Sequence, residues 1–306
     1  MKRLATSLAG TVLLLAGAAL AQTPPDIAAK VRAAGPVMDP SFGKLYAPMF
    51  PKEPYPGVSV TRDIAYGSDP LQKLDVYAPT PSRGKRTVLL FVHGGGFTRG
   101  DKHQPGGFYP DNMTLWGAQH GMVGVNIDYR LAPKDPWPAG AKDLASAIAW
   151  THANIARYGG DPNRIIIWGH SAGANHVADY VAHPEVRGPE ASSVKGAVIL
   201  SAFYAANPTG DPPNAYYGAD PKLQSAGASI ESLSHSPVPL FVAGAEFDPE
   251  PFRLYAASMR DGLCKAGRCP TFVYLKDHNH FTEGMAVGTS DVALTDPLLK
   301  WIQARR

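Results

Sequence analysis

The sequence predicts an α/β fold, in which a mostly parallel β-sheet is covered by helices on both sides. Short apolar runs such as residues 87–92 and 164–168 have the composition of strands that are buried on both faces. They alternate with segments such as residues 138–158, where apolar residues recur at the three- to four-residue spacing of a helix. Strands that alternate with helices in this way form parallel sheets with a helical layer on each face.

The first half of the expected domain begins with two strands, 58–65 and 72–77. They are joined by Gly67-Ser68-Asp69-Pro70, a composition typical of a turn. Continuous apolar runs at 87–92 and 122–128 predict the next two strands. The helix expected over 138–158 is ended by Gly159-Gly160.

The second half continues the alternation. The expected strands are 164–168, 194–201, 238–243 and 271–275, and the expected helices are 171–182, 251–266 and 291–303. Residues 202–236 interrupt the pattern as a long loop that contains several aromatic residues. Loops of this length within a compact domain usually serve function. Because this loop leaves the end of a strand, we expect it over the carboxyl edge of the sheet, where α/β folds bind ligands.

The N-terminal part of the chain is expected to lie outside the domain. Lys2 and Arg3 precede a short apolar stretch, and Ala19-Leu20-Ala21 offers a small-residue cleavage site. Residues 1–21 are therefore predicted to be a cleaved signal peptide that directs the protein to the periplasm or the medium. The apolar stretch is too short for a membrane span, so none is expected in the mature chain. Residues 22–57 are rich in proline and are expected to form an irregular arm, a possible part of a cap, before a catalytic domain at 58–306.

Composition excludes several classes of protein. The 306 residues are 44% hydrophobic and 18% charged, as in ordinary globular proteins. Cleavage of the signal peptide removes Lys2 and Arg3 and lowers the net charge from +3 to +1. With no cluster of cations on one face, nucleic acid is not an expected partner. The two cysteines, Cys264 and Cys269, are expected to form a local disulfide in an oxidising compartment, and two sulfur ligands are too few for a metal site.

The strongest functional pattern is Gly-x-Ser-x-Gly at Gly169–Gly173, directly after the strand expected at 164–168. A strand that runs through this pattern into a helix is the sequence form of a nucleophile elbow. The two glycines allow the backbone to pass close by while the serine projects outward. The pattern therefore predicts Ser171 as a catalytic nucleophile.

Serine needs a base within hydrogen-bond reach, and the base needs an acid that orients it. In the elbow fold these residues follow in the order Ser, Asp or Glu, His. His280 is the expected base, with His278 as the alternative, since both follow the strand expected at 271–275. Asp248 is the expected acid because it follows the strand expected at 238–243, and Glu246 is its competitor. Asp248-Pro249 is also a common helix-capping pattern.

A glycine-rich segment, His93-Gly94-Gly95-Gly96-Phe97, follows the strand expected at 87–92. Acyl transfer passes through an oxyanion, and backbone N–H groups held at its future position stabilise it. We expect these donors to be Gly95, Gly96 and Ala172, the residue after the nucleophile. The chain has neither of the common nucleotide-binding glycine patterns, which disfavours nucleotide binding.

Taken in order, His93–Phe97, the segment Asp128-Tyr129-Arg130-Leu131-Ala132-Pro133 and Gly169–Gly173 resemble the α/β-hydrolase esterases. More closely, they are similar to the hormone-sensitive-lipase-like and feruloyl-esterase-like carboxylesterase branch. The resemblance covers residues 58–306 and implies an α/β-hydrolase fold with a small cap or loop region over the site. It also implies Ser–Asp–His hydrolysis of carboxylic esters without a metal or cofactor. The family's usual acid motif is only partly matched after Asp248-Pro249, and the expected glycine between His280 and Phe281 is missing.

The predicted function is therefore hydrolysis of a small-molecule carboxylic ester through an acyl-enzyme. Amide hydrolysis of the arylformamidase or peptidase type is the nearer alternative, because the motifs do not encode the leaving group. A non-catalytic binding protein of the same fold is the more distant one. Acyl and alcohol specificity, activity on polymers and the oligomeric state are not readable from the sequence.

Overall fold

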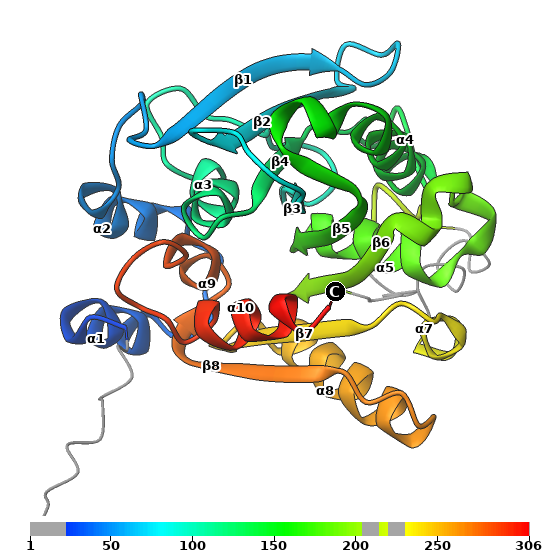
Figure 1. Ribbon diagram of the computed structural model, residues 1–306. Coiled ribbons are helices and arrows are strands. Elements are labelled where there is room, and N and C mark those ends of the chain that lie inside the picture. The colour runs from blue at the N-terminus through cyan, green and yellow to red at the C-terminus, as the bar shows by residue number, and fades with distance from the viewer. Residues whose placement is uncertain (1–22, 204–213, 220–229, 306) are drawn as a thin grey trace, which may run out of the picture.

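The computed structural model describes residues 23–203, 214–219 and 230–305. The predicted signal peptide, residues 1–21, lies outside them. Within these ranges the chain forms an eight-stranded sheet flanked by helices (Figure 1). The strands are β1 (Val58–Ala65), β2 (Lys73–Pro79), β3 (Arg86–Val92), β4 (Val123–Ile127), β5 (Gly160–His170), β6 (Val194–Leu200), β7 (Leu240–Phe247) and β8 (Thr271–Asn279).

The sheet is mostly parallel, as the sequence predicts. Its strands lie in the order β1-β2-β4-β3-β5-β6-β7-β8, and β2 is antiparallel to both β1 and β4. The other neighbours are parallel. In their register, Val92 lies opposite Gly169, and Leu200 lies opposite both His170 and Ala243. The carboxyl ends of β3, β5, β6 and β7 therefore meet at one edge of the sheet.

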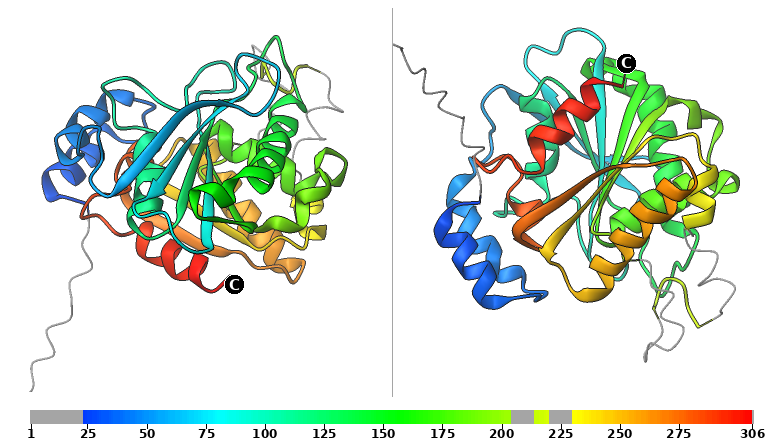
Figure 2. Two further views of the ribbon diagram at one scale, coloured as in Figure 1. Left: turned by 45° about the horizontal axis from the view of Figure 1, so that its top comes forward. Right: turned by 90° about the horizontal axis from the view of Figure 1, so that it is seen from below.

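Helices cover both faces of the sheet. They are α1 (Pro25–Ala34), α2 (Gly43–Tyr46), α3 (Asp111–Gln119), α4 (Ala139–Asn154), α5 (Ala172–Ala182), α7 (Ile230–His235), α8 (Glu250–Lys265), α9 (Thr282–Met285) and α10 (Thr295–Gln303). Apolar side chains of α4, α5, α7 and α8 pack on one face of the sheet, and those of α3 and α10 pack on the other. Figure 2 shows α10 and α8 on opposite sides of the strands. Within the described ranges, no helix is both long and apolar enough to cross a membrane.

Successive side chains of the central strands point alternately into two hydrophobic cores, one on each face of the sheet. Leu90 and Val92 of β3 point into the core under α4 and α5, whereas Leu89 and Phe91 point into the core under α3 and α10. Successive side chains of a strand lie on opposite faces, so a strand buried on both faces must be apolar throughout. This is the reason that residues 88–92 of β3 form an unbroken apolar run.

The proline-rich arm is not irregular, and this part of the prediction is wrong. Residues 25–34 form helix α1, with Pro25 at its first position, where a missing N–H costs nothing. Ile27 and Val31 pack with Tyr46 of α2 against Met285. The arm lies beside the C-terminal half of the chain, with α1 against β8 and α2 against α9 (Figure 1).

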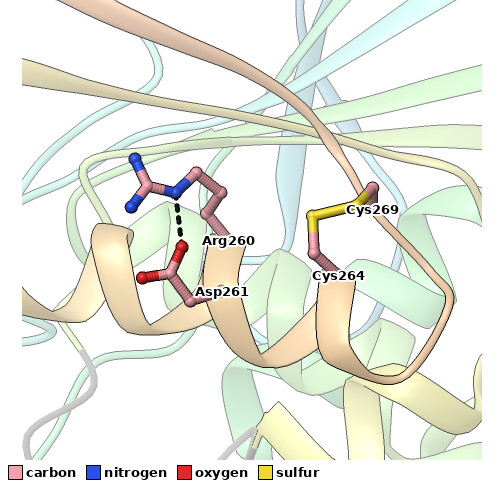
Figure 3. Close-up of a disulfide and its surroundings, with 4 residues drawn as sticks. All are labelled: Arg260, Asp261, Cys264 and Cys269. Carbon is pink, nitrogen blue, oxygen red and sulfur yellow. Dashed lines mark hydrogen bonds and ion pairs between the residues drawn. A yellow bond between two sulfur atoms is a disulfide. The ribbon is translucent and has the colours of Figure 1, made fainter.

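The expected disulfide between Cys264 and Cys269 is present. It joins the last turn of α8 to the segment that leads into β8 (Figure 3). Helix α8 also carries an exposed ion pair between Arg260 and Asp261, which Figure 3 shows one turn before Cys264. The disulfide therefore fixes the connection between the helix that follows Asp248 and the strand that precedes His280.

The long loop predicted over 202–236 is only partly described. Residues 230–235 form α7, so the loop contains a helix that the sequence did not indicate. Tyr216 and Tyr217 are buried against Phe97 of the glycine-rich segment, with the Phe97 and Tyr216 rings stacked 4.8 Å apart. Residues 204–213 and 220–229 lie outside the described ranges. The described tyrosines thus pack on the expected edge of the sheet.

Candidate active site

Ser171 lies in the tight turn between β5 and α5, with φ 55° and ψ −123°. A Cβ atom on Gly173 would come within 2.1 Å of the Val92 carbonyl oxygen. One on Gly169 would come within 2.2 Å of the Gly173 carbonyl oxygen. Any other residue at either position would force the backbone apart, so the turn needs both glycines.

His280 follows the last residue of β8 and reaches the serine. Its Nε2 lies 2.8 Å from the Ser171 Oγ. His278, the alternative base, makes different contacts: its Nε2 lies 3.0 Å from the Thr23 Oγ1 and 3.1 Å from an Asp291 carboxylate oxygen. The structure therefore brings His280, rather than His278, to Ser171.

Asp248 lies just after β7 and is almost fully buried, with 1% of its surface exposed. Its Oδ1 is 2.9 Å from the His280 Nδ1. The N-cap residue of helix α8 is Pro249, and no side-chain hydrogen bond caps the helix. The Asp248 carboxylate therefore does not serve as a helix cap. The competing acid, Glu246, instead accepts a hydrogen bond from the Asp277 backbone N–H at 2.9 Å.

The second oxygen of the Asp248 carboxylate is held by two donors that sequence reasoning missed. Its Oδ2 accepts from the Ser201 hydroxyl at 2.5 Å and from the Ala245 N–H at 2.9 Å. Ser201 directly follows β6, just as Ser171 directly follows β5. A polar residue at the carboxyl end of an apolar strand is the signal that could have found it.

The glycine-rich segment lies beside the nucleophile. A Cβ atom on Gly94 would be 3.0 Å from the Ser171 Cβ and, on Gly95, 1.9 Å from the Arg99 carbonyl oxygen. Gly95 and Gly96 have φ values of 124° and 62°, which favour glycine. In the described part of the chain, no hydrogen bond uses the N–H of Gly95, Gly96 or Ala172. These three predicted donors thus have no hydrogen-bond partner within the described residues.

The side chains of His93 and Tyr129 contact the backbone of the glycine-rich segment. The His93 Nδ1 lies 2.6 Å from the Gly94 carbonyl oxygen, and the Tyr129 hydroxyl donates to the His93 carbonyl at 2.9 Å. The two rings stack with their centroids 4.5 Å apart. His93 thus bonds within its own loop and does not bind the backbone N–H groups of Gly95 and Gly96.

The contacts define one direction of proton transfer. A carboxylate can only accept, so the His280 Nδ1 carries the hydrogen that faces Asp248. The His280 Nε2 is then unprotonated and can accept the Ser171 hydroxyl proton. Phenylalanine rings surround the imidazole, with Phe252 at 4.5 Å and Phe281 at 5.7 Å between centroids. The arrangement can generate a serine alkoxide next to free backbone donors, the chemistry of acyl transfer.

Comparison with known proteins identifies the fold. The esterase from the archaeon Pyrobaculum calidifontis superimposes with a TM-score of 0.68 at 20% identity, over 92% of this chain and 98% of that one. A bacterial heroin esterase superimposes with a TM-score of 0.64 at 22% identity, over 92% and 98% of the two chains. The BD-FAE family model matches residues 74–186. The chain has the α/β-hydrolase fold.

Two curated proteins that the chain resembles are named as esterases. LipC of Mycobacterium tuberculosis is 41% identical over 115 residues, which are 37% of this chain and 28% of LipC. LipQ of the same organism is 31% identical over 244 residues, which are 72% of this chain and 57% of LipQ. The chain thus covers less than two thirds of the length of either relative. These matches confirm the expected resemblance to the carboxylesterase branch of the family.

A buried histidine next to the site gives a prediction about stability. His176 on α5 lies against Phe97 and Tyr129, and within the described ranges neither ring nitrogen has a partner. Burial, with a smaller repulsion from His93, lowers the pKa of His176 to about 3. Between pH 6.5 and 3 the unfolded chain therefore binds a proton that the folded chain does not.

The free energy of unfolding should accordingly decrease as the pH is lowered through this window, by about 1.4 kcal/mol per pH unit for this group. We expect His176→Leu to remove that part of the slope in urea unfolding measured from pH 6.5 to 4.5. His235→Leu, at an exposed histidine of α7, should leave the slope unchanged. An unchanged slope in the His176 variant would show that the imidazole is protonated in the folded state.

Proposed function

We propose that this α/β-hydrolase hydrolyses carboxylic esters through an acyl-enzyme on Ser171. The observation that carries the proposal is the continuous chain of hydrogen bonds from Ser171 through His280 to Asp248, next to three unused backbone donors. The esterase relatives support ester chemistry. No separate observation favours an amide substrate, which is therefore an outcome of the test.

In the proposed mechanism, the His280 Nε2 takes the Ser171 hydroxyl proton as Oγ attacks the ester carbonyl carbon. The N–H groups of Gly95, Gly96 and Ala172 stabilise the oxyanion of the tetrahedral intermediate. Asp248 holds the imidazole in its reactive tautomer and stabilises the imidazolium. The intermediate collapses as His280 gives the proton to the leaving alkoxide, which departs as the alcohol.

The acyl-enzyme is then hydrolysed by the same groups. His280 takes a proton from water, whose oxygen attacks the acyl carbon and forms a second oxyanion in the same place. Collapse of this intermediate returns the proton to the Ser171 Oγ and releases the carboxylic acid. At the end of the cycle Ser171 and His280 are back in their starting protonation states, so water is the only co-reactant that the mechanism needs.

The test is a turnover panel of p-nitrophenyl esters with two to sixteen acyl carbons, an aryl ester and an N-formyl aryl amine. We expect turnover of esters with kcat/KM well above that for the amide. If the amide were preferred over every ester, the chain would instead be an amide hydrolase. If no compound were turned over and a fluorophosphonate failed to label Ser171, the non-catalytic alternative would hold.

We also propose that the protein works outside the cytoplasm, after cleavage behind Ala21. The Cys264–Cys269 disulfide supports this location, because such bonds persist in oxidising compartments. N-terminal sequencing of the protein recovered from the periplasm or medium should give a chain that begins at Gln22. Recovery of a reduced, uncleaved chain from the cytoplasm alone would contradict the proposal.

A further inference from the structure

His170, the last residue of β5, is buried directly behind the Ser171–His280–Asp248 group and has no part in the mechanism above. Only 2% of its surface is exposed, and its ring centroid is 4.9 Å from that of His280. Its Nε2 lies 2.8 Å from the backbone carbonyl oxygen of His280. Its Nδ1 lies 2.7 Å from the Tyr109 hydroxyl.

These two contacts fix the tautomer of His170. A carbonyl oxygen can only accept, so Nε2 carries the hydrogen and donates to the His280 carbonyl. Nδ1 is then an acceptor, and the Tyr109 hydroxyl donates to it. With both ring nitrogens engaged, the imidazole has one orientation in which every polar atom is satisfied.

The surroundings keep His170 neutral. Burial, together with the positive charge that His280 can carry, lowers the pKa of His170 to about 3. Its neighbour Glu283 lies with one carboxyl oxygen 3.3 Å from the His170 Nε2. Burial and the nearby charge of Asp248 raise the pKa of Glu283 well above its ordinary value. Both shifts favour the neutral forms, and the His280 carbonyl oxygen, at 2.8 Å, lies closer to the Nε2 than the Glu283 oxygen at 3.3 Å.

We propose that His170 is a positioning residue, whose Nε2–H holds the main chain of His280 and so sets where the general base lies relative to Ser171. His170 is the last residue of β5 and precedes Ser171, so this hydrogen bond connects the main chain of His280 to the strand that carries the nucleophile. Without it, His280 follows the end of β8 with its carbonyl unpaired in a buried place. The proposal rests on the proposed function, which makes His280 the base.

Two substitutions separate this role from a general need for the side chain. The amide nitrogen of Gln reaches the position of a histidine Nε2, whereas that of Asn reaches only the position of Nδ1. His170→Gln keeps the donor to the His280 carbonyl, and His170→Asn removes it. Because misplacement by about 1 Å can cost 10²-fold in rate, we expect His170→Asn to lower kcat about 100-fold. KM should stay within about threefold, and His170→Gln should stay within about fivefold of the parent kcat.

A spectroscopic measurement distinguishes positioning from folding. The downfield proton resonance of the His280–Asp248 hydrogen bond should persist in His170→Gln and be lost or moved upfield in His170→Asn. His152→Gln is the matched control, because the His152 Nδ1 lies 3.0 Å from the Pro162 carbonyl oxygen, and the Gln amide does not reach the Nδ1 position that makes this contact. It should leave both kcat and the resonance unchanged.

The outcomes are distinct. Equal activity in the Asn and Gln variants of His170, whether both high or both low, would overturn the positioning role while the parent still hydrolyses esters. A parent without esterase activity would instead refute the proposed function. Should His170→Asn fail to fold, Tyr109→Phe tests the role through the other ring nitrogen: it keeps His170 but removes the hydroxyl that donates to Nδ1 and thereby keeps the hydrogen on Nε2. It should lower kcat about fivefold and shift the resonance, and an unaltered kcat and resonance would overturn the proposal.

Discussion

Replacing Ser171 by alanine is expected to lower kcat for ester hydrolysis by about 10⁴- to 10⁶-fold. The substitution removes the atom that His280 is placed to activate for attack, the Oγ at 2.8 Å from its Nε2. The fold should be preserved, because alanine has the same Cβ atom at this positive φ. The residual rate would come from substrate binding and the backbone donors alone.

The measurement is kcat on the best ester of the panel, together with labelling by a fluorophosphonate. Ser146→Ala, at a half-buried serine of α4 whose hydroxyl donates to the Lys142 carbonyl, is the control and should retain the parent kcat and labelling. A circular dichroism spectrum identical to the parent's would show that the fold is intact. Activity of Ser171→Ala within tenfold of the parent would refute the assignment of the nucleophile.

Sequence reasoning predicted the sheet well where the strands are buried on both faces. The first strand has the expected bounds, Val58–Ala65, and β3 begins one residue before the expected run. An uninterrupted apolar run can hardly be anything other than a central strand or a buried helix, and its short length decides between them. The order of the chemistry along the chain was equally readable, because each candidate residue follows the end of a strand.

Other parts of the structure depend on contacts that a sequence does not display. Helix α3 was not predicted, and its Met113 and Trp116 are recognisable as core only once β3 and β5 lie beneath them. Helix α1 was hidden by the proline content of its surroundings, although Pro25 at its first position was a usable signal. Glu283 joins the site through folding alone, since it lies in no recognisable pattern, whereas the only signal for Ser201 is its place at the carboxyl end of an apolar strand.

The choice between His278 and His280 shows the same limit at the scale of two residues. Both histidines follow the apolar part of β8, and both are buried. They differ because the His278 Nε2 contacts Thr23 and Asp291, two residues that are far from it or outside its motif in the sequence. No local pattern around 277–281 contains that information, so the alternative could be resolved only in three dimensions.

Asp248→Asn should lower kcat by about 10⁴-fold, more than the loss of a charge alone would suggest. The Ser201 hydroxyl and the Ala245 N–H both donate to Oδ2, so the amide oxygen of Asn must take that position. Its NH₂ group then faces the His280 Nδ1 and forces this nitrogen to accept. The hydrogen moves to Nε2, where it blocks proton transfer from Ser171.

The companion variants turn this argument into a test of the tautomer. Asp248→Ala leaves no donor facing the His280 Nδ1, so the imidazole can still adopt the reactive tautomer, and we expect it to retain more activity than Asp248→Asn. Glu246→Gln, at the competing acid, should keep kcat within about threefold of the parent value, because Glu246 accepts a hydrogen bond from the Asp277 N–H and not from His280. Loss of activity in Glu246→Gln equal to that in Asp248→Asn would move the role of acid to Glu246. A kcat for Asp248→Asn above 1% of the parent value would mean that His280 does not depend on this carboxylate for its tautomer.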